Sequence, residues 1–177
     1  MFILVVNKRK KEYKITTPGK HVFYFENLTA DLTFVIAAEH AEVAIYGLYQ
    51  GKDTDDFVLD ISQIHTAPHT KSTALIKSVL RDNAQLHMRG KIRVEQNSVG
   101  TEALLTNTNL LLSKNAHVIS MPQLEILPHE VHCTHAAQTK PLDPDQLDYL
   151  INRGITPHDA RQLLIDGFLQ EILQYKE

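Results

Sequence analysis

Apolar and polar residues alternate along most of residues 21–135, and this alternation limits what the chain can fold into more than any other feature. In the clearest stretch, Leu86, Met88, Ile92 and Val94 are interleaved with polar or charged residues. Side chains on a β-strand point to opposite faces in turn, so this pattern is typical of strands that bury one face. No long helical period with caps interrupts the region. The sequence therefore predicts a mainly β body.

A weak internal repeat runs through this β-rich region. Three segments, starting at Ala41, Ala84 and Ala116, place an apolar residue two positions later and a glycine or proline six positions later. Recurring short strands with small residues at corners indicate a stacked β architecture such as a β-helix, with the three alanines near equivalent corners. An antiparallel sandwich with coincidental similarity is the alternative, and the pattern alone favours the sandwich.

The chain changes character near Pro141, where helical signals replace the alternation. Asp143 and Thr156 are each followed by a proline, and a capping side chain before a proline is typical of a helix start. Gly154 suits the left-handed position at which a helix ends. Apolar side chains follow both starts at helical spacing. These stripes predict packing on the molecule's own core, with a partner-binding surface as the less frequent alternative.

These patterns divide the chain into two parts. We expect a β-helix-like core over residues 1–140 and a helical segment over residues 141–177, with helices at about 144–153 and 157–173. A chain of 177 residues is long enough for one domain with a real core and short for two. Both parts are therefore expected to form one compact domain.

Composition narrows the class of protein. Hydrophobic residues make up 43% and charged residues 22%, as in an ordinary globular protein, and the net charge of −3 gives no general attraction to nucleic acid. The apolar run from Met1 to Val6 is too short for a signal-peptide core or a membrane span. The single cysteine, Cys133, forms no internal disulfide, which fits a reducing compartment. We expect a cytoplasmic protein that binds neither nucleic acid nor a membrane.

Cys133 and His135 have the spacing of a ligand pair on a strand. Residues at i and i+2 share one face, with Cα atoms about 6.6 Å apart, so thiolate and imidazole converge on one metal ion, whereas His132 points to the opposite face. Sulfur with nitrogen suits iron or zinc. Both metals usually take four ligands, so the others have to come from a second chain or from the sulfides of a cluster. The plainer alternative is a cysteine packed as a hydrophobe beside a satisfied histidine.

Other candidate residues are weaker. His65 and His69 have a metal-like spacing, but Pro68 lies between them and no helical pattern surrounds them, so we interpret them as strand-end or turn residues. Glu125 alternates with apolar neighbours and is expected to face solvent rather than to act as a ligand or base. No nucleophile–base pair is recognisable, so no catalytic residue is assigned.

Several short motifs occur in a fixed order over residues 60–172: His65–Thr70, Leu110–Ser113, Pro122–Ile126, Val131–Ala137, Leu142–Asp143, Gln146–Leu147 with Tyr149–Leu150, Arg153–Ile155, Ala160–Arg161 with Leu163–Ile165, and Phe168. In order and spacing these motifs resemble the core domain of the SufB/SufD family. No single motif is decisive, but their combination is specific, and the Cys-x-His form at Cys133 resembles SufD more than SufB. Ala136 stands where the family commonly has glycine, and the chain is less than half the usual length.

The resemblance implies a right-handed β-helix followed by two short C-terminal α-helices. It implies a non-catalytic scaffold subunit of the SUF system, on which nascent iron–sulfur clusters are built, beside a SufC-type ABC ATPase that docks on the C-terminal helices. The end of the β-helix forms the subunit contact in this family. We therefore expect a SufB-like partner or a homodimer through strands around Val131–Ala137, with Cys133 and His135 sharing a transient iron–sulfur cluster with the partner chain.

Two other classes of protein stay open on the sequence. A small cupin-type metalloprotein would hold iron through histidines in a β-barrel, which fits the ten histidines, although no two histidines are separated by a single residue. A β-helix interaction module without metal would keep the fold and lack the cluster role.

Overall fold

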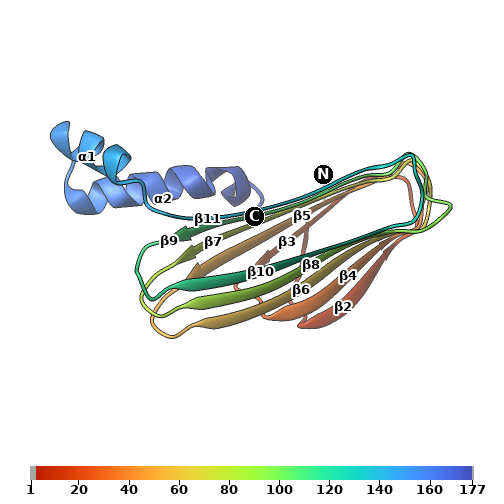
Figure 1. Cartoon of the computed structure of the whole chain (residues 1–177), viewed down its shortest axis with the longest axis horizontal. Coiled ribbons are helices and arrows are strands. Elements are labelled where there is room, and N and C mark those ends of the chain that lie inside the picture. The colour runs from red at the N-terminus through yellow and green to blue at the C-terminus, as the bar shows by residue number, and fades with distance from the viewer. Residues whose placement is uncertain (1–2, 177) are drawn as a thin grey trace.

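The computed structural model describes residues 3–176, which form two β-sheets and two C-terminal helices (Figure 1). The strands are β1 (Ile3–Val5), β2 (Lys10–Ile15), β3 (Gly19–Glu26), β4 (Ala30–Ile36), β5 (Ala41–Gly51), β6 (Asp56–His65), β7 (Lys71–Leu80), β8 (Gln85–Val94), β9 (Glu102–Leu111), β10 (His117–Ile126) and β11 (His132–Pro141). The helices are α1 (Pro144–Asn152) and α2 (Pro157–Leu173).

Successive strands alternate between the two sheets. The odd-numbered strands form a six-stranded sheet in the order β1-β3-β5-β7-β9-β11, here called sheet A, and the even-numbered strands form a five-stranded sheet in the order β10-β8-β6-β4-β2, here called sheet B. All strand pairs among the described residues are parallel. The chain thus winds as a flattened β-helix-like stack with one strand of each coil in each sheet. This confirms the predicted fold class and overturns the antiparallel sandwich and the cupin-type barrel, which are built from antiparallel strands.

The core fills the space between the two sheets. Because neighbouring strands are in register, each inward position continues as a column through the stack, and Phe34, Gln63 and Ile92 form one such column in sheet B. The alternation in β8 places Leu86 and Met88 in this core and the interleaved polar residues outside, as predicted. Each large apolar side chain buried in this way contributes about 1.5–3 kcal/mol to folding.

The three alanines of the sequence repeat do not occupy equivalent corners. Ala84 and Ala116 precede β8 and β10 and are neighbours in the stack, where the backbone N–H of His117 donates to the carbonyl of Ala84 at 3.1 Å. Ala41 begins β5 in sheet A and therefore lies at the opposite edge of the stack. All three are buried where a strand begins, and the sequence template does not distinguish the two edges.

Both helices begin and end where the sequence predicts. The side chain of Asp143 accepts a hydrogen bond from the backbone N–H of Asp145 at 3.0 Å, and that of Thr156 accepts one from Asp159 at 3.2 Å. Gly154, with φ of 88°, lies in the left-handed region after α1. Each capping side chain contributes about 1 kcal/mol to its helix. None of these helices within residues 3–176 is long and apolar enough to cross a membrane.

Only the second half of α2 packs on the β stack. Leu169 and Ile172 are buried against an apolar cluster on the outer face of sheet A that includes Leu48 and Val79. α1 contains no buried residue and lies beyond the ends of the strands, where there is no sheet surface beneath it (Figure 1). The prediction that both apolar stripes pack on the molecule's own core is therefore right for α2 in part and wrong for α1.

Lys77 holds α2 against sheet A. Its ammonium group donates to the carbonyl of Phe168 at 2.7 Å, lies 2.9 Å from the carboxylate of Glu171, and sits 5.0 Å from the centre of the Phe168 ring. The lysine side chain is only 10% exposed. A charged donor shielded from water in this way makes a stronger contact than a surface ion pair.

Replacing Lys77 tests this anchor. Lys77→Met keeps the aliphatic stem and removes the ammonium, so we expect the docking of α2 to weaken by about 1–2 kcal/mol. Hydrogen exchange of amides in the second half of α2 should then accelerate by about 5- to 30-fold, with little change in β5 and β7. Lys71→Met on the same strand is the matched control, because Lys71 makes a half-exposed ion pair with Glu102. Equal exchange rates in the two variants would contradict the anchor.

Candidate functional site

The stack ends in two edge strands, β10 in sheet B and β11 in sheet A, each paired on one side only. Their inward side chains have no further coil above them. Leu124 and Ile126 of β10 are 49% and 40% exposed, whereas Ile92 and Val94, their register partners one coil earlier, are 0% exposed. The last coil therefore presents core-type side chains to the surroundings. We call this surface of β10 and β11 the open end.

The two edge strands differ as templates for pairing with another chain. Pro122 lies in the middle of β10 and removes one backbone donor there, and prolines inside strands are found mainly on edge strands. The only proline of β11 is its last residue, Pro141, so its backbone donors continue along the rest of the strand. Exposed apolar side chains beside an unpaired strand mark an interaction surface.

Cys133 and His135 lie on β11 at this open end. In the register with β9, Cys133 is opposite Ala103 and His135 is opposite Leu105. Both side chains are half-buried and share the inner face of the strand, as predicted, while His132 is exposed on the outer face. The structure thus places the two predicted ligands on the same face of an edge strand.

The imidazole of His135 occupies a space that exists because residue 90 is a glycine. A Cβ atom at Gly90 would lie 3.1 Å from Nε2 of His135 and 2.8 Å from Cδ1 of Leu105. Nε2 of His135 is shielded from solvent and has no hydrogen-bond partner within residues 3–176. Burial lowers the pKa of His135, so the neutral imidazole that binds metals is favoured. Sequence reasoning used Gly90 only as the sixth position of the repeat template and missed its closeness to His135, although a glycine inside a strand is a signal of close approach.

Cys133 is less ready to bind a metal than His135. Its side chain packs against the main hydrophobic core. Burial raises the pKa of the Cys133 thiol, and a backbone hydrogen bond with Ala103 opposes that shift in part. The thiol is therefore protonated at neutral pH, and binding a metal requires it to release a proton. This environment also fits the plainer interpretation of Cys133 as a packed hydrophobe.

Within residues 3–176, no third ligand joins the pair. The described part of the chain contains no group of three or more His, Cys, Asp or Glu side chains placed to hold a metal ion. Glu125 faces outward on sheet B, where Lys91 contacts its carboxylate at 2.7 Å and lowers its pKa, so it is the solvent-facing residue that the alternation predicts.

His65 and His69 have structural positions, as predicted. His65 ends β6 inside the core, with its ring nitrogens 2.7 Å from Oγ1 of Thr70 and 2.8 Å from Oγ of Ser72. Burial lowers the pKa of His65 to about 4, so the ring is neutral at physiological pH. His69 lies in the following turn with φ of 53° and stacks on His40 with ring centres 5.7 Å apart.

A buried polar row ties the edge strand β11 to the coils below it. Oγ of Ser78 donates to Oδ1 of Asn109 at 2.7 Å, and Nδ2 of Asn109 lies 2.6 Å from Oδ1 of Asn107 and 3.1 Å from Oγ1 of Thr139. Thr139 belongs to β11, so this network helps to hold the strand that carries the candidate ligands. The sequence alternation did not indicate this network, because the alternation predicts that polar residues lie on the outer face of a strand.

Comparison with known proteins supplies the family. The family model described as "SUF system FeS cluster assembly, SufBD core domain" matches residues 23–168. The iron–sulfur cluster assembly protein SufD of Escherichia coli (strain K12) is 36% identical over 110 residues, which cover 62% of this chain and 26% of that protein.

Two further relatives match longer segments. An iron–sulfur cluster assembly SufBD family protein of a Synechocystis species is 35% identical over 136 residues, covering 77% of this chain and 30% of that protein. An iron–sulfur cluster assembly SufBD family protein of Mycobacterium leprae is 33% identical over 140 residues, which cover 75% of this chain and 36% of that protein. The chain spans about a quarter to a third of the length of these curated relatives. Because the family model covers the chain from β3 through most of α2, the chain belongs to the SufBD core domain family of the SUF system for iron–sulfur cluster assembly.

Proposed function

We propose that this chain is a SufD-like scaffold subunit of the SUF system, located in the cytoplasm and without catalytic activity of its own. It holds a nascent iron–sulfur cluster transiently at the open end and releases it to other proteins. The observation that carries this proposal is the position of Cys133 and His135, which face inward on an edge strand that has no neighbour on one side. A cargo that has to be assembled and released needs such an accessible position.

The donor types suit an iron–sulfur cluster. Thiolate and imidazole both bind such clusters. Each iron takes part of its ligands from the sulfides of the cluster and the rest from protein side chains. One chain contributes two protein ligands, Cys133 and His135, so a second chain has to complete the site. A cluster held between two chains is released when either chain moves away.

The second chain pairs at the open end. A SufB-like subunit or a second copy of this chain adds its own strands to the edges of β10 and β11, each of which is ten residues long. This covers the exposed Leu124 and Ile126 and satisfies the free backbone groups. In a homodimer, two copies of the Cys133 and His135 pair approach each other across the two-fold axis and together provide four protein ligands.

A SufC-type ABC ATPase docks on the C-terminal helices. Tyr149 of α1 and Leu163 of α2 are 59% and 52% exposed, and with the neighbouring Leu150 and Leu164 they line an apolar groove on the helix pair. Large apolar side chains at this exposure are suited to a protein partner. Because no residue of α1 is fully buried and the helix lies beyond the ends of the strands (Figure 1), a partner reaches this groove without displacing the β stack.

A metal-free interaction module is the second candidate function. The packing of Cys133 against the main core and the raised pKa of its thiol favour this alternative. It keeps the open end and the helix groove as contact surfaces and gives Cys133 no role beyond packing.

Anaerobic reconstitution with iron and sulfide distinguishes the two functions. We expect the wild-type chain to gain visible charge-transfer absorption together with bound iron and sulfide. Cys133→Ser and His135→Ala remove one ligand each and should lower cluster affinity by about tenfold or more. His132→Ala is the matched control, because it lies on the same strand and faces outward. Wild-type absorption in Cys133→Ser and His135→Ala would favour the metal-free module.

Light scattering tests the assembly at the open end. We expect a homodimer at micromolar concentration, or a heterodimer when a SufB-like chain is present. Leu124→Lys places a charge in the contact and should raise the dissociation constant by about tenfold or more. Val58→Lys is the control, since Val58 is 40% exposed on the outer face of sheet B. A wild-type monomer that recovers no SufB-like partner from cells would exclude this assembly.

Co-purification with a SufC-type ATPase tests the helix surface. Leu163→Glu introduces a charge into the apolar groove and should reduce ATPase recovery by about tenfold, while circular dichroism shows unchanged helix content. Gln170→Glu adds the same charge to an exposed position in the second half of α2 and should leave recovery unchanged. Equal recovery with both variants would mean that the ATPase does not use this groove.

A further inference from the structure

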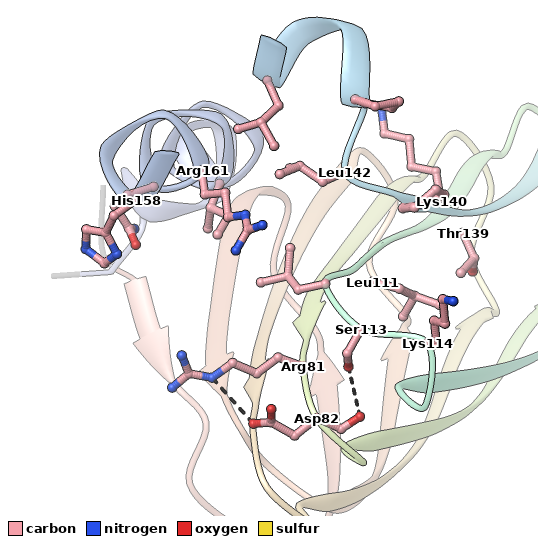
Figure 2. Close-up of a pocket in the computed structure, with 16 residues that line it drawn as sticks. Arg81, Asp82, Leu111, Ser113, Lys114, Thr139, Lys140, Leu142, His158 and Arg161 are labelled. Atoms are coloured by element: carbon pink, nitrogen blue, oxygen red, sulfur yellow. Dashed lines mark hydrogen bonds and ion pairs between the residues drawn. The ribbon is translucent and has the colours of Figure 1, made fainter. Parts of the chain in front are cut away.

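A second groove, with a volume of about 760 Å³, lies between the helices and one corner of the β stack (Figure 2). Its lining includes neither the residues of the apolar groove on the helix pair nor Cys133 and His135. The lining comes from four parts of the chain: the turn after β7 (Arg81-Asp82), the end of β9 and the turn after it (residues 111–114), the end of β11 with α1 (residues 139–142, Pro144 and Leu147), and one face of α2 (His158, Arg161, Gln162 and Ile165). We call it the basic groove.

Positive charge is in excess in the basic groove. Asp82 is its only acidic residue, and the carboxylate of Asp82 already lies 3.9 Å from Nε of Arg81 and accepts the backbone N–H of Asp53 at 3.1 Å. Lys114, Lys140 and Arg161 make no ion pair within residues 3–176, in a chain whose net charge is −3. Figure 2 shows Arg161 extending from α2 into the hollow that Arg81 approaches from the β corner. These cations come from four separate elements: Arg81, Lys114, Lys140 and Arg161.

The floor of the basic groove is apolar. Its apolar side chains are half-buried and come from the ends of β9 and β11 and from both helices: Leu111, Leu112, Leu142, Leu147 and Ile165. A ligand that covers this floor removes apolar surface from water and at the same time shields the surrounding cations from solvent. Charge interactions strengthen as water is excluded, so the two effects reinforce each other.

We propose that the basic groove binds an acidic peptide segment of a partner protein, in which carboxylates lie next to a bulky apolar side chain. The carboxylates pair with Arg161 and Lys114, and the planar guanidinium of Arg161 provides two parallel donors to one of them. The apolar side chain rests on the leucine floor. The inference goes beyond the scaffold role, since it names the chemistry of a docking partner and does not depend on cluster binding.

The distribution of groups favours a peptide over other anions. Nucleic acid binding relies on many phosphate contacts along an extended basic surface, whereas here the cations border an apolar floor on a chain of negative net charge. A free phosphate makes no use of the floor formed by Leu111, Leu142 and Ile165. An acidic segment with an apolar side chain matches both features.

Amide chemical-shift titration of the full chain tests the inference, with a capped synthetic peptide of alternating glutamate and leucine as the probe. We expect shifts confined to the residues that line the basic groove. The double variant K114E/R161E should raise the dissociation constant by about tenfold or more. The double variant K14E/K20E changes the net charge equally at exposed sites on β2 and β3 and should leave the constant within about twofold.

Four outcomes would overturn the inference. They are an absence of shifts in the basic groove, equal weakening in the two double variants, equal binding by a peptide in which serine replaces leucine, and the same shifts with inorganic phosphate or a DNA duplex alone. An absence of shifts would exclude a peptide site in the basic groove. Equal weakening in the two double variants would mean that only the net charge of the chain attracts the peptide. Equal binding by the serine peptide would mean that the apolar floor makes no contribution. The last assigns the groove to a different anion. Loss of ATPase recovery in L163E does not bear on this result.

Discussion

In-register parallel pairing of successive coils is the constraint on which the rest of the structure depends. It aligns each inward position into a column, so that Phe34, Gln63, Ile92 and Leu124 follow one another through sheet B. Each column of buried side chains ends at the last coil, because the parallel stack is open and its last strands have no neighbour on one side. The last residue of each column therefore becomes surface, and the candidate ligands belong to that last coil.

Lys77 sets the second main feature, the position of the helices. It anchors α2 through Phe168 and Glu171 on the outer face of sheet A and leaves the first half of α2 and all of α1 projecting beyond the strands (Figure 1). This overhang creates the apolar groove between the helices and the basic groove between helix and corner. The open end therefore results from the unpaired last coil, and the apolar groove and the basic groove result from a helix that is anchored at one end only.

Local rules predicted much of this fold, and the errors have physical reasons. The caps at Asp143 and Thr156 depend on neighbouring residues only, so the helix boundaries could be read from the sequence. Ala41 and Ala84 lie at opposite edges because β5 belongs to sheet A and β8 to sheet B. The sequence does not show which sheet a strand joins, and an alanine is compatible with both edges. The sequence template includes Gly90 but does not show why a glycine is needed there, because the imidazole of His135 that approaches it belongs to β11, which is distant from β8 in the sequence.

The open end also explains how two unequal ligands can serve one proposed site. Burial acts on both side chains in β11, but it favours the metal-binding form of His135 and disfavours that of Cys133. An iron ion or cluster has to displace the thiol proton, so binding at this pair weakens as the pH falls. In the proposed assembly, a partner that covers the open end would exclude water and so strengthen the attraction between the iron and the thiolate. Cluster retention and subunit pairing are coupled in this proposed assembly, because separation of the subunits would return Cys133 to its protonated, packed state.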